Sequence, residues 1–439
     1  MRKGLIAVGI IVLMVGLASS LQAGGIINKQ NLSADYIRTL NRNAADDMAD
    51  AAVFNPAGTV RLQDGFYVKA DVIYLYKDYS NQLPNAIGPL PLTGGTLDSK
   101  EPSIIPGMFA VYKQDRWSGF FAVTVPGGGG KVDFKDGDSR TTMLSLPGAL
   151  GGFGTYLGGA AGNPNNINQQ IEAESHYVGY SLGAAYKVLD SLSLSGGVRY
   201  VDAFQKFKGS ASGTTGAAPQ TINIKIERTD EAWNYFMGLD YAPIKDLNFA
   251  LTYMSNTALN FKADTSDNSP GKRVSTSVGW ADGTHEREDL PGYLAFGVNY
   301  FIIPGTLRIE PNFTYYLEKQ ATFQGARFQE SNPGNSYDVG VALEYILNPQ
   351  WRFSVGYLHT EIKGMKSYDL LPEAPELDAN SIACGLVWSP IERLDLTLGL
   401  ERSWYDSVKT DRNSSRAPAG THYDKDVYGA AFGIQYRFF

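Results

Sequence analysis

Apolar and polar residues alternate along most of the chain beyond residue 65. In LDLTLGLE (394–401) leucine occupies every second position, and Asp, Thr, Gly and Glu stand between the leucines. WRFSVGY (351–357) and LSLSGGVRY (192–200) follow the same rule. A period of two is typical of a β-strand with one apolar and one polar face. The apolar face of such strands packs on a core in a soluble sandwich and faces lipid in a membrane barrel.

A repeated hairpin pattern favours the barrel. Each copy has a strand that ends in an aromatic or apolar residue, a tight turn with Pro, Asp or Asn, and a second alternating strand. The joining segments, such as 208–221, 263–285 and 366–378, are longer and polar, and short turns opposite long loops are typical of outer-membrane barrels. The six copies, a first strand (66–79) and a last strand (426–439) predict an all-β, antiparallel transmembrane barrel of fourteen strands, give or take about two. Both termini are then periplasmic. The copies span 107–125, 183–200, 238–254, 297–313, 340–359 and 384–400.

The first residues have the layout of a secretory signal peptide. Arg2 and Lys3 precede an apolar run that ends at Leu17, and small residues follow. Cleavage is expected after Ala23 or after Ser20. A membrane anchor is the alternative, but the run is shorter than the ~20 residues that a spanning helix needs. We therefore divide the chain into a signal peptide (1–23), an N-terminal hatch (24–64) and a barrel (65–439).

Charge and chemistry exclude several functions. The net charge is −7 and no block of like charge occurs, so nucleic acid is not an expected partner. One cysteine, Cys384, permits no intrachain disulfide, and the four histidines show no metal-ligand spacing, so we expect no metal and no cofactor. GYSLG (179–183) fits G-x-S-x-G around Ser181, but it lies inside a predicted strand, and His176 projects from the other face. We therefore expect no enzyme; an outer-membrane phospholipase is the enzymatic alternative.

The final strand, VYGAAFGIQYRFF (427–439), ends the protein on an aromatic residue, as barrels of this class usually do. Its alternation places Phe438 on the apolar face and Phe439 on the other. Either Phe438 is the functional terminal aromatic, or the strand has a small irregularity at its end.

Residues 24–64 form the only long segment without strand pattern between the signal peptide and the first strand. Fourteen strands enclose a lumen that wall side chains alone cannot fill, so this segment is sized to plug it. NAADDMADAAVF (43–54) predicts a compact helix that Pro56 ends. Asn55 can bond the freed backbone groups, and Gly58 permits a turn towards the wall. An ordinary helix stop in a periplasmic extension is the alternative.

The stretch DDMADAAVFNPAG (46–58) resembles the most recognisable motif of the FadL-type transporters, the long-chain fatty acid and aromatic hydrocarbon channels of Gram-negative outer membranes. The resemblance covers the mature chain, but only this motif is specific. It implies that Asn55, Pro56 and Ala57 form the hatch motif. It also implies a hydrophobic site under the extracellular loops and sideways exit through a gap near the third strand.

Two stretches match these roles physically. The uncharged segment 143–162 would expose an apolar patch of the kind that marks a binding surface, unless it only packs over the barrel mouth. VTVPGGGGKVDF (123–134) contains a proline and four glycines that cannot complete a wall strand, which predicts either a lateral opening or a strand end that runs into a loop. It is not a phosphate loop, because Val132 follows Lys131. The predicted ligand-binding residues are Leu144, Leu146, Leu150, Phe153, Tyr156 and Leu157, with Ile26 and Ile27 of the hatch; the predicted lateral opening consists of Pro126, Gly127, Gly128, Gly129 and Gly130.

Together these features predict a passive, hatch-gated outer-membrane channel for hydrophobic small molecules. Its expected partners are the apolar ligand, outer-membrane lipid with lipopolysaccharide, and the barrel assembly machinery, and we expect a monomer. A general porin or an adhesin barrel is the alternative. The sequence leaves open whether the ligand is a fatty acid, an alkane or an aromatic compound, and whether it exits laterally or towards the periplasm.

Overall fold

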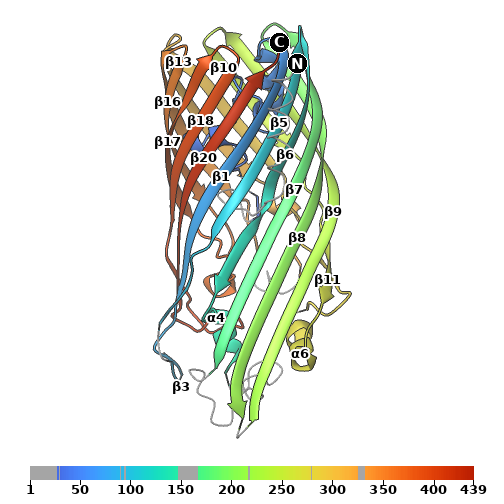
Figure 1. Cartoon of the computed structure of the whole chain (residues 1–439), viewed down its shortest axis with the longest axis vertical. Helices are drawn as coiled ribbons and strands as arrows, with labels where there is room; N and C mark the ends of the chain where they lie inside the picture. Colours follow the sequence, from blue (N-terminus) through green and yellow to red (C-terminus); the bar gives the residue numbers. More distant parts are fainter. Residues whose placement is uncertain are drawn as a thin grey trace.

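The computed structural model describes residues 27–28, 30–88, 90–92, 95–146, 167–215, 218–277, 279–324 and 332–439. The expected signal peptide and its cleavage site lie outside them. The main sheet has 18 strands, of which β4 (Thr96–Ser99), β11 (Asn260–Thr265), β12 (His285–Arg287) and β19 (Val408–Lys409) are short additions. The other fourteen form an antiparallel wall, which closes where β1 pairs with β20 (Figure 1).

The six predicted hairpins are confirmed as β5–β6, β7–β8, β9–β10, β13–β14, β15–β16 and β17–β18. The small strands β2 (Ala86–Ile87) and β3 (Leu90–Pro91) pair apart from the wall. The wall strands are β1 (Gly65–Gln82), β5 (Pro102–Gln114), β6 (Trp117–Phe134), β7 (Asn168–Leu189), β8 (Leu192–Thr215), β9 (Ala218–Ile244), β10 (Leu247–Met254), β13 (Tyr293–Ile303), β14 (Leu307–Tyr316), β15 (Tyr337–Asn348), β16 (Trp351–Glu361), β17 (Ala379–Ile391), β18 (Leu394–Tyr405) and β20 (His422–Arg437).

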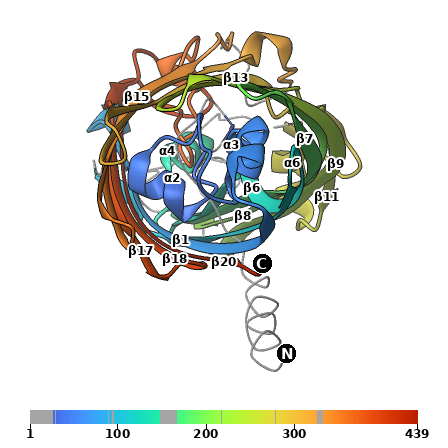
Figure 2. The ribbon, with the colours of Figure 1, turned by 90° about the horizontal axis from the view of Figure 1, so that it is seen from above.

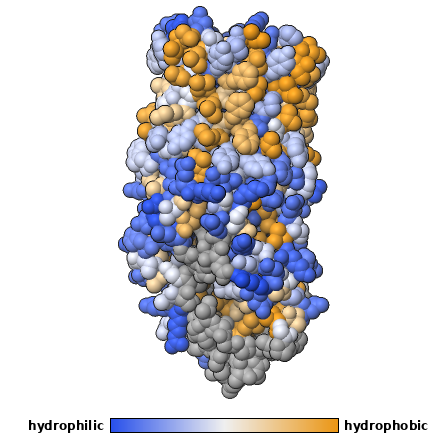
Figure 3. All heavy atoms as spheres, turned by 180° about the vertical axis from the view of Figure 1, so that it is seen from behind, coloured by the Kyte–Doolittle hydropathy of each residue, from blue (hydrophilic) through white to orange (hydrophobic). Residues whose placement is uncertain are grey.

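The outward face of the wall is apolar near the short turns and polar beyond. On β1 the outward positions are apolar or aromatic from Phe66 to Tyr76 and then change to Asp78 and Ser80. Figure 3 shows the apolar side chains gathered in the upper part of the barrel, with polar side chains below them. A lipid-facing band bounded by polar surface is the signature of an outer-membrane barrel. No helix in the described part of the chain is long and apolar enough to cross a membrane.

One of the three expected long loops is wrong, and the other two join neighbouring hairpins as expected. The segment 208–221 is not a loop, because β8 and β9 stay paired up to Thr215↔Ala218. The segment 263–285 contains the helix α6 (Ser269–Ser277) between β11 and β12. The β8–β9 ladder extends beyond the lipid-facing band, so the composition of the segment 208–221 no longer follows the alternation of lipid-facing strands. The segment 366–378 holds only the 3₁₀ turn η6 (Ser367–Asp369) and no strand.

The N-terminal segment lies inside the ring of strands (Figure 2). It contains α2 (Ala34–Thr39), α3 (Ala51–Phe54) and the 3₁₀ helix η1 (Pro56–Arg61). The expected helix over 43–54 is therefore wrong in extent, and α2 was missed. Asp46 and Asp47 lie outside regular helix and form ion pairs with arginines of the hatch and the wall. α3 ends at Phe54 and Pro56 opens η1, as expected.

Two sequence interpretations, one in the hatch and one at the C-terminus, need revision. Gly58 is needed for space rather than for a turn, because a Cβ there would lie 2.3 Å from the Ala45 carbonyl oxygen. At the C-terminus β20 ends at Arg437, so strand alternation does not apply to the last two residues. Phe438 stacks near Phe66, and the ring of Phe439 lies 6.3 Å from that of Tyr112.

Candidate functional site

A network of ion pairs fixes the hatch to one side of the wall. Asp47 lies 2.8 Å from Arg42 of the hatch, 3.5 Å from Arg308 on β14 and 2.7 Å from Arg352 on β16. Glu344 on β15 joins the same group at 3.0 Å from Arg308. Buried charges with several partners hold one geometry, and removal of one partner leaves the others uncompensated. We call residues 33–62, which this network holds, the hatch body.

The Asn-Pro-Ala motif ties the hatch body to another strand. Asn55 donates from Nδ2 to the Ala45 carbonyl oxygen at 3.0 Å and to Asp240 of β9 at 2.7 Å. Asp240 also forms an ion pair with Arg61. Ala57 is fully buried where η1 begins. Asn55 therefore links the hatch body to β9. The sequence alone could not reveal this contact, because it joins residues far apart in the chain.

The wall has an incomplete seam between β5 and β6. Their pairing runs from Gln114↔Trp117 to Met108↔Val123 and stops there. In the described range 95–146, residues 102–107 of β5 and 124–134 of β6 have no ladder between them. The outward side chain of Ile104, 38% exposed, belongs to the apolar band, so the seam opens at the depth of lipid. We call this the open seam.

The predicted opening residues form the kink that creates this seam. On its other side β6 stays paired with β7, but the register shifts between Thr124 and Gly127 and again between Gly127 and Gly130. Gly128 has φ 102°, and a Cβ there would lie 2.7 Å from the Ser175 carbonyl oxygen. Only glycine fits this position without rearrangement.

Two buried side chains replace part of the missing ladder. Lys77 of β1 donates to the carbonyl oxygens of Gly129, at 3.3 Å, and of Lys131. The Asp133 N–H donates to Ser99 Oγ at 2.8 Å. Lys77 lies at the edge of the apolar band and Ser99 pairs with Tyr79 just beyond it, so these contacts give partners to backbone groups where the open seam leaves the lipid.

The first described residues lie along the inner side of the open seam. We call the described residues 27, 28 and 30–32 the arm. Asn28 forms an isolated bridge with Gly127 of β6, and the Leu32 carbonyl oxygen would lie 2.7 Å from a Cβ added to Gly107 of β5. Both polar atoms of the buried Asn31 side chain lack a hydrogen-bond partner in the described part of the chain. The arm therefore spans the seam but is held by few polar contacts.

Ile27, one of the predicted ligand contacts, lies buried in an apolar cluster; Ile26 is outside the described residues. The cluster joins the arm to the inner faces of several wall strands and to the segment between β12 and β13. Its other buried members are Tyr177, Val201, Ala203, Leu259, Phe261 and Leu290. Ile27 thus contacts the lumen wall rather than solvent.

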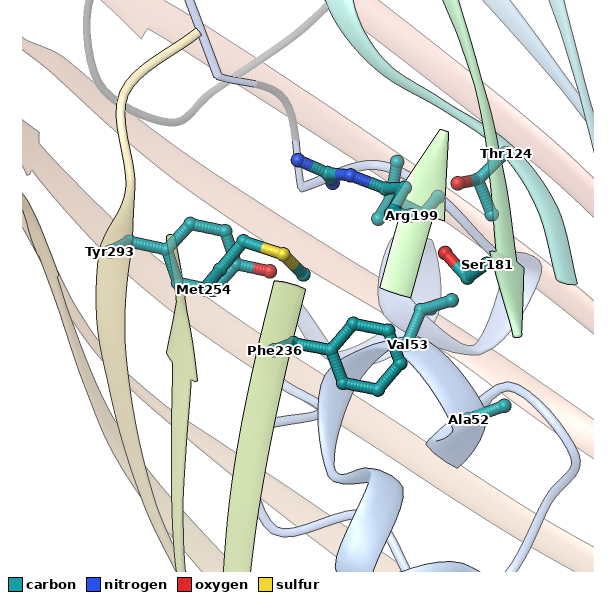
Figure 4. A pocket seen from close by; sticks show the side chains of 9 residues that line it. Ala52, Val53, Thr124, Ser181, Arg199, Phe236, Met254 and Tyr293 are labelled. Atoms are coloured by element: carbon teal, nitrogen blue, oxygen red, sulfur yellow. The ribbon is translucent and has the colours of Figure 1, made fainter. Parts of the chain in front are cut away.

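An inner pocket lies between the hatch and the wall, close to the kink (Figure 4). Its volume is about 10 Å³, which is room for one water molecule. Apolar side chains from the arm, the hatch body and the wall contribute much of the lining, together with three hydroxyls and one guanidinium. The lining residues are Leu32, Ala52, Val53, Thr124, Ser181, Arg199, Phe236, Met254 and Tyr293.

A larger outer pocket lies at the end with the long loops. Its volume is about 70 Å³, and α4 (Ser139–Leu144), β7, β8, β9 and α6 line it. Predicted Leu144 is one of the lining residues, whereas half-buried Leu146 follows α4 and is not among them. Predicted Leu150, Phe153, Tyr156 and Leu157 lie outside the described residues. Most of the apolar lining was missed: Ile171, Phe207, Ile222, Ile224, Ile226, Val274 and Trp280.

The arrangement offers no catalytic constellation of the kind considered from sequence. GYSLG lies within β7, and Ser181 faces the inner pocket. His176 packs against Phe204 of β8, with ring centroids 5.1 Å apart. Among the described residues, no three His, Cys, Asp or Glu side chains gather in a way that could hold a metal.

Comparisons with known proteins agree with this geometry. Residues 169–438 match the family described as "Outer membrane protein transport protein (OMPP1/FadL/TodX)". No curated protein matches the sequence.

Solved structures have the same fold at low identity. A Pseudomonas aeruginosa FadL homologue has a TM-score of 0.70 at 14% identity, covering 94% of this chain and 100% of its own. The Pseudomonas putida toluene transporter TodX has a TM-score of 0.63 at 12% identity, covering 90% and 96%. The Ralstonia pickettii toluene transporter TbuX has a TM-score of 0.57 at 14% identity, covering 89% and 94%. The chain belongs to the OMPP1/FadL/TodX family of transport proteins and forms a fourteen-stranded barrel of the Gram-negative outer membrane.

Proposed function

We propose that this protein takes up hydrophobic small molecules passively, capturing them in the outer pocket and releasing them sideways through the open seam. The observation that carries the proposal is the missing β5–β6 ladder at lipid depth, beside a pocket at the hatch. A wall that only enclosed a water-filled pore would gain stability from a closed ladder there.

The driving force is the removal of apolar surface from water, worth ~25 cal/mol per Å². The ligand would first leave water for the apolar lining of the outer pocket. It would finally leave the protein for the lipid outside Ile104. Each step lowers the free energy of an apolar molecule, so no cofactor or nucleotide is required. Lipopolysaccharide around the band and the assembly machinery that inserts the barrel complete the proposed partners.

The arm is proposed as the gate. The inner pocket has room for one water molecule, so a ligand needs part of its lining to move. Leu32 is the lining residue that belongs to the arm, and the described arm residues 27, 28 and 30–32 carry no charged side chain, unlike the hatch body. Displacement of the arm would enlarge the pocket and uncover the seam in one movement.

Deletion of residues 24–30 tests the gate. The variant should fold as a barrel, because the hatch body keeps its ion pairs, but it should bind a hydrophobic probe such as toluene more weakly after Ile26 and Ile27 are lost. Equilibrium binding to the detergent-solubilised protein measures this. Unchanged affinity would show that the arm lies outside the binding site.

A general porin is the competing function, and a liposome swelling assay separates the two. Because the hatch body occupies the lumen and is tied to β14, β15 and β16, we expect sugars to be excluded. Swelling in arabinose or sucrose at the rate of a porin would contradict the proposed channel.

A further inference from the structure

The segment between β10 and β13 leaves the wall and returns to it. It carries β11, α6 and β12, and it lies beside the outer half of β9 (Figure 1). Its ladder with the wall is short: residues 262–265 of β11 pair with residues 226–229 of β9. We call the described residues 255–277 and 279–292 the flap. Backbone pairing alone holds the flap to the wall far less than it holds β8 to β9.

Arg228 of β9 provides a second, buried attachment for the flap. Its side chain is 1% exposed and donates to Glu286 at 2.7 Å and to Glu288 at 3.3 Å. The guanidinium also lies 5.1 Å from the ring of Phe261 and 5.0 Å from that of Trp280. All four partners belong to the flap. One arginine of the wall thus gathers four side chains of the flap around it.

This polar layer lies between the outer and the inner pocket. Phe207 of β8 and Ile226 of β9 are opposite partners that line the outer pocket. The next inward-facing pair is Gln205 and Arg228, joined by a hydrogen bond of 2.7 Å. Arg199, farther along β8, lines the inner pocket, roughly 26 Å from Phe207 by the rise of a strand. A ligand that moves along β8 and β9 from one pocket to the other has to cross the layer around Arg228.

The inner end of the flap contacts the arm and the kink. Asn28 of the arm donates from Nδ2 to the Pro291 carbonyl oxygen at 2.8 Å. Leu290 belongs to the same buried cluster as Ile27, and its Cδ1 would lie 3.2 Å from a Cβ added to Gly127. At its other end the flap lines the outer pocket with α6. A single segment therefore touches the outer pocket, the arm and the open seam.

We propose that the flap is an inner gate between the two pockets, locked to the wall by Arg228, and that its opening releases the arm. This rests on the proposed transport function and deepens it, because it names the device that links capture to release. Arg228 needs both carboxylates in place, so the flap has a docked and a released state.

The outer pocket gives a ligand a reason to favour the released state. Its volume of about 70 Å³ is smaller than the ~150 Å³ of a cavity that holds benzene. A hydrophobic molecule therefore gains contact when α6 moves away from β8 and β9, and a ligand shifts an equilibrium towards the state that it binds better. The same movement would separate Glu286 and Glu288 from Arg228 and withdraw Pro291 from Asn28.

Hydrogen exchange of the full-length protein in a non-ionic detergent tests the link to the arm without any ligand. Arg228→Met leaves Glu286 and Glu288 buried without this cation, so flap amides should exchange at least about 10-fold faster. Arm amides should exchange faster with them, and those of β17 and β18 should not change. Lys225→Met, at an exposed lysine of β9 paired with Glu227, is the control. Faster exchange in the flap alone would overturn the link.

A disulfide that fixes the flap tests the gate even if the first variant fails to fold. Asp264 of β11 and Glu227 of β9 are opposite partners on the outward face, and such residues lie ~4.5–5.5 Å apart, within reach of a disulfide. In a Cys384→Ser background, Glu227→Cys with Asp264→Cys should reduce uptake of labelled toluene and dodecanoate to the level of cells without the channel. A reductant should restore it. Glu172→Cys with Lys208→Cys, which joins β7 to β8 within the wall, is the control and should transport in both states.

The gate and the transport function fail in different ways. Equal uptake by the oxidised and the reduced flap disulfide would overturn the gate while transport stands. Failure of wild type to take up either compound faster than cells without the channel would overturn transport. Hydrogen exchange then decides by itself whether the flap and the arm open together.

Discussion

Two strand pairs of the same wall differ in how far their backbone pairing extends. β17 and β18 are paired from Ala379↔Tyr405 to Ile391↔Leu394, along their whole length. The β5–β6 ladder ends at Met108↔Val123, and beyond it the two strands separate. The hatch body is fixed to the closed side by Arg308, Glu344 and Arg352, whereas the described part of the arm lies along the open seam.

This difference shows how an opening can be built into a lipid-facing wall. Pro102 and Pro106 on β5 and Pro126 on β6 have no N–H to leave unpaired, and Lys77 and Ser99 satisfy groups that remain. The opening thus avoids much of the cost of unsatisfied backbone in lipid. Ion pairs hold the hatch body to the closed side, and in the proposed mechanism the arm is the part that moves.

The largest effect should come from conversion of the open seam into a closed one. Replacing Pro126 and Gly127–Gly130 with Val-Thr-Val-Thr-Val should straighten β6, because side chains at 127 and 128 do not fit the kink. The barrel should be at least as heat-stable, but cells should take up labelled dodecanoate or toluene no faster than cells without the channel. Pro126→Ala, which keeps the glycines, is the matched control and should retain uptake. Normal uptake by the five-residue variant would show that the ligand exits elsewhere.

On the closed side, Asp47→Asn should loosen the hatch body. The substitution leaves Arg42, Arg308 and Arg352 short of one shared carboxylate, which by comparison with broken buried pairs costs about 3–5 kcal/mol. Sugar leakage in the swelling assay and protease cleavage within residues 33–62 would measure it. Asp78→Asn, at an exposed residue paired with Lys100, should change neither. An intact seal in the Asp47 variant would show that the ion pairs do not hold the hatch.

A smaller effect is expected from Lys77→Met at the open seam. Loss of the ammonium leaves the carbonyl oxygens of Gly129 and Lys131 without this donor, which costs about 1–3 kcal/mol. Urea unfolding in detergent should report that loss, and uptake should fall as the kink loses its support. Lys100→Met removes an exposed lysine 3.6 Å from Asp78 and serves as the control. Equal stability of the two variants would mean that Lys77 does not support the opening.

The wall could be predicted from the sequence because its lipid-facing side chains are apolar and alternate with inward-facing polar ones. Alternation and short turns are local signals, and the six hairpins read from them are all present. The segment 208–221 was misjudged because the strands leave the lipid band there, so its composition no longer follows the rule although β8 and β9 remain paired.

The candidate site was less predictable because its contacts join residues far apart in the chain. Pro126 and the four glycines are visible as strand breakers, but Lys77 lies about fifty residues earlier and acts across β5. The helix expected over 43–54 is short, and Asp47 binds Arg308 and Arg352 instead, which no local pattern reveals. In the outer pocket, the isoleucines of INIKI (222–226) alternate as strand residues do and gave no sign of lining a cavity.

The central claim is lateral exit through the open seam, and photo-crosslinking tests it most directly. A dodecanoate or toluene analogue with a diazirine group would be taken up by cells and activated while transport proceeds. We predict crosslinks at residues 102–107 of β5 and 124–134 of β6, and none above background along β17 and β18. Crosslinks confined to the hatch body and the short periplasmic turns, with none at the seam, would contradict the account.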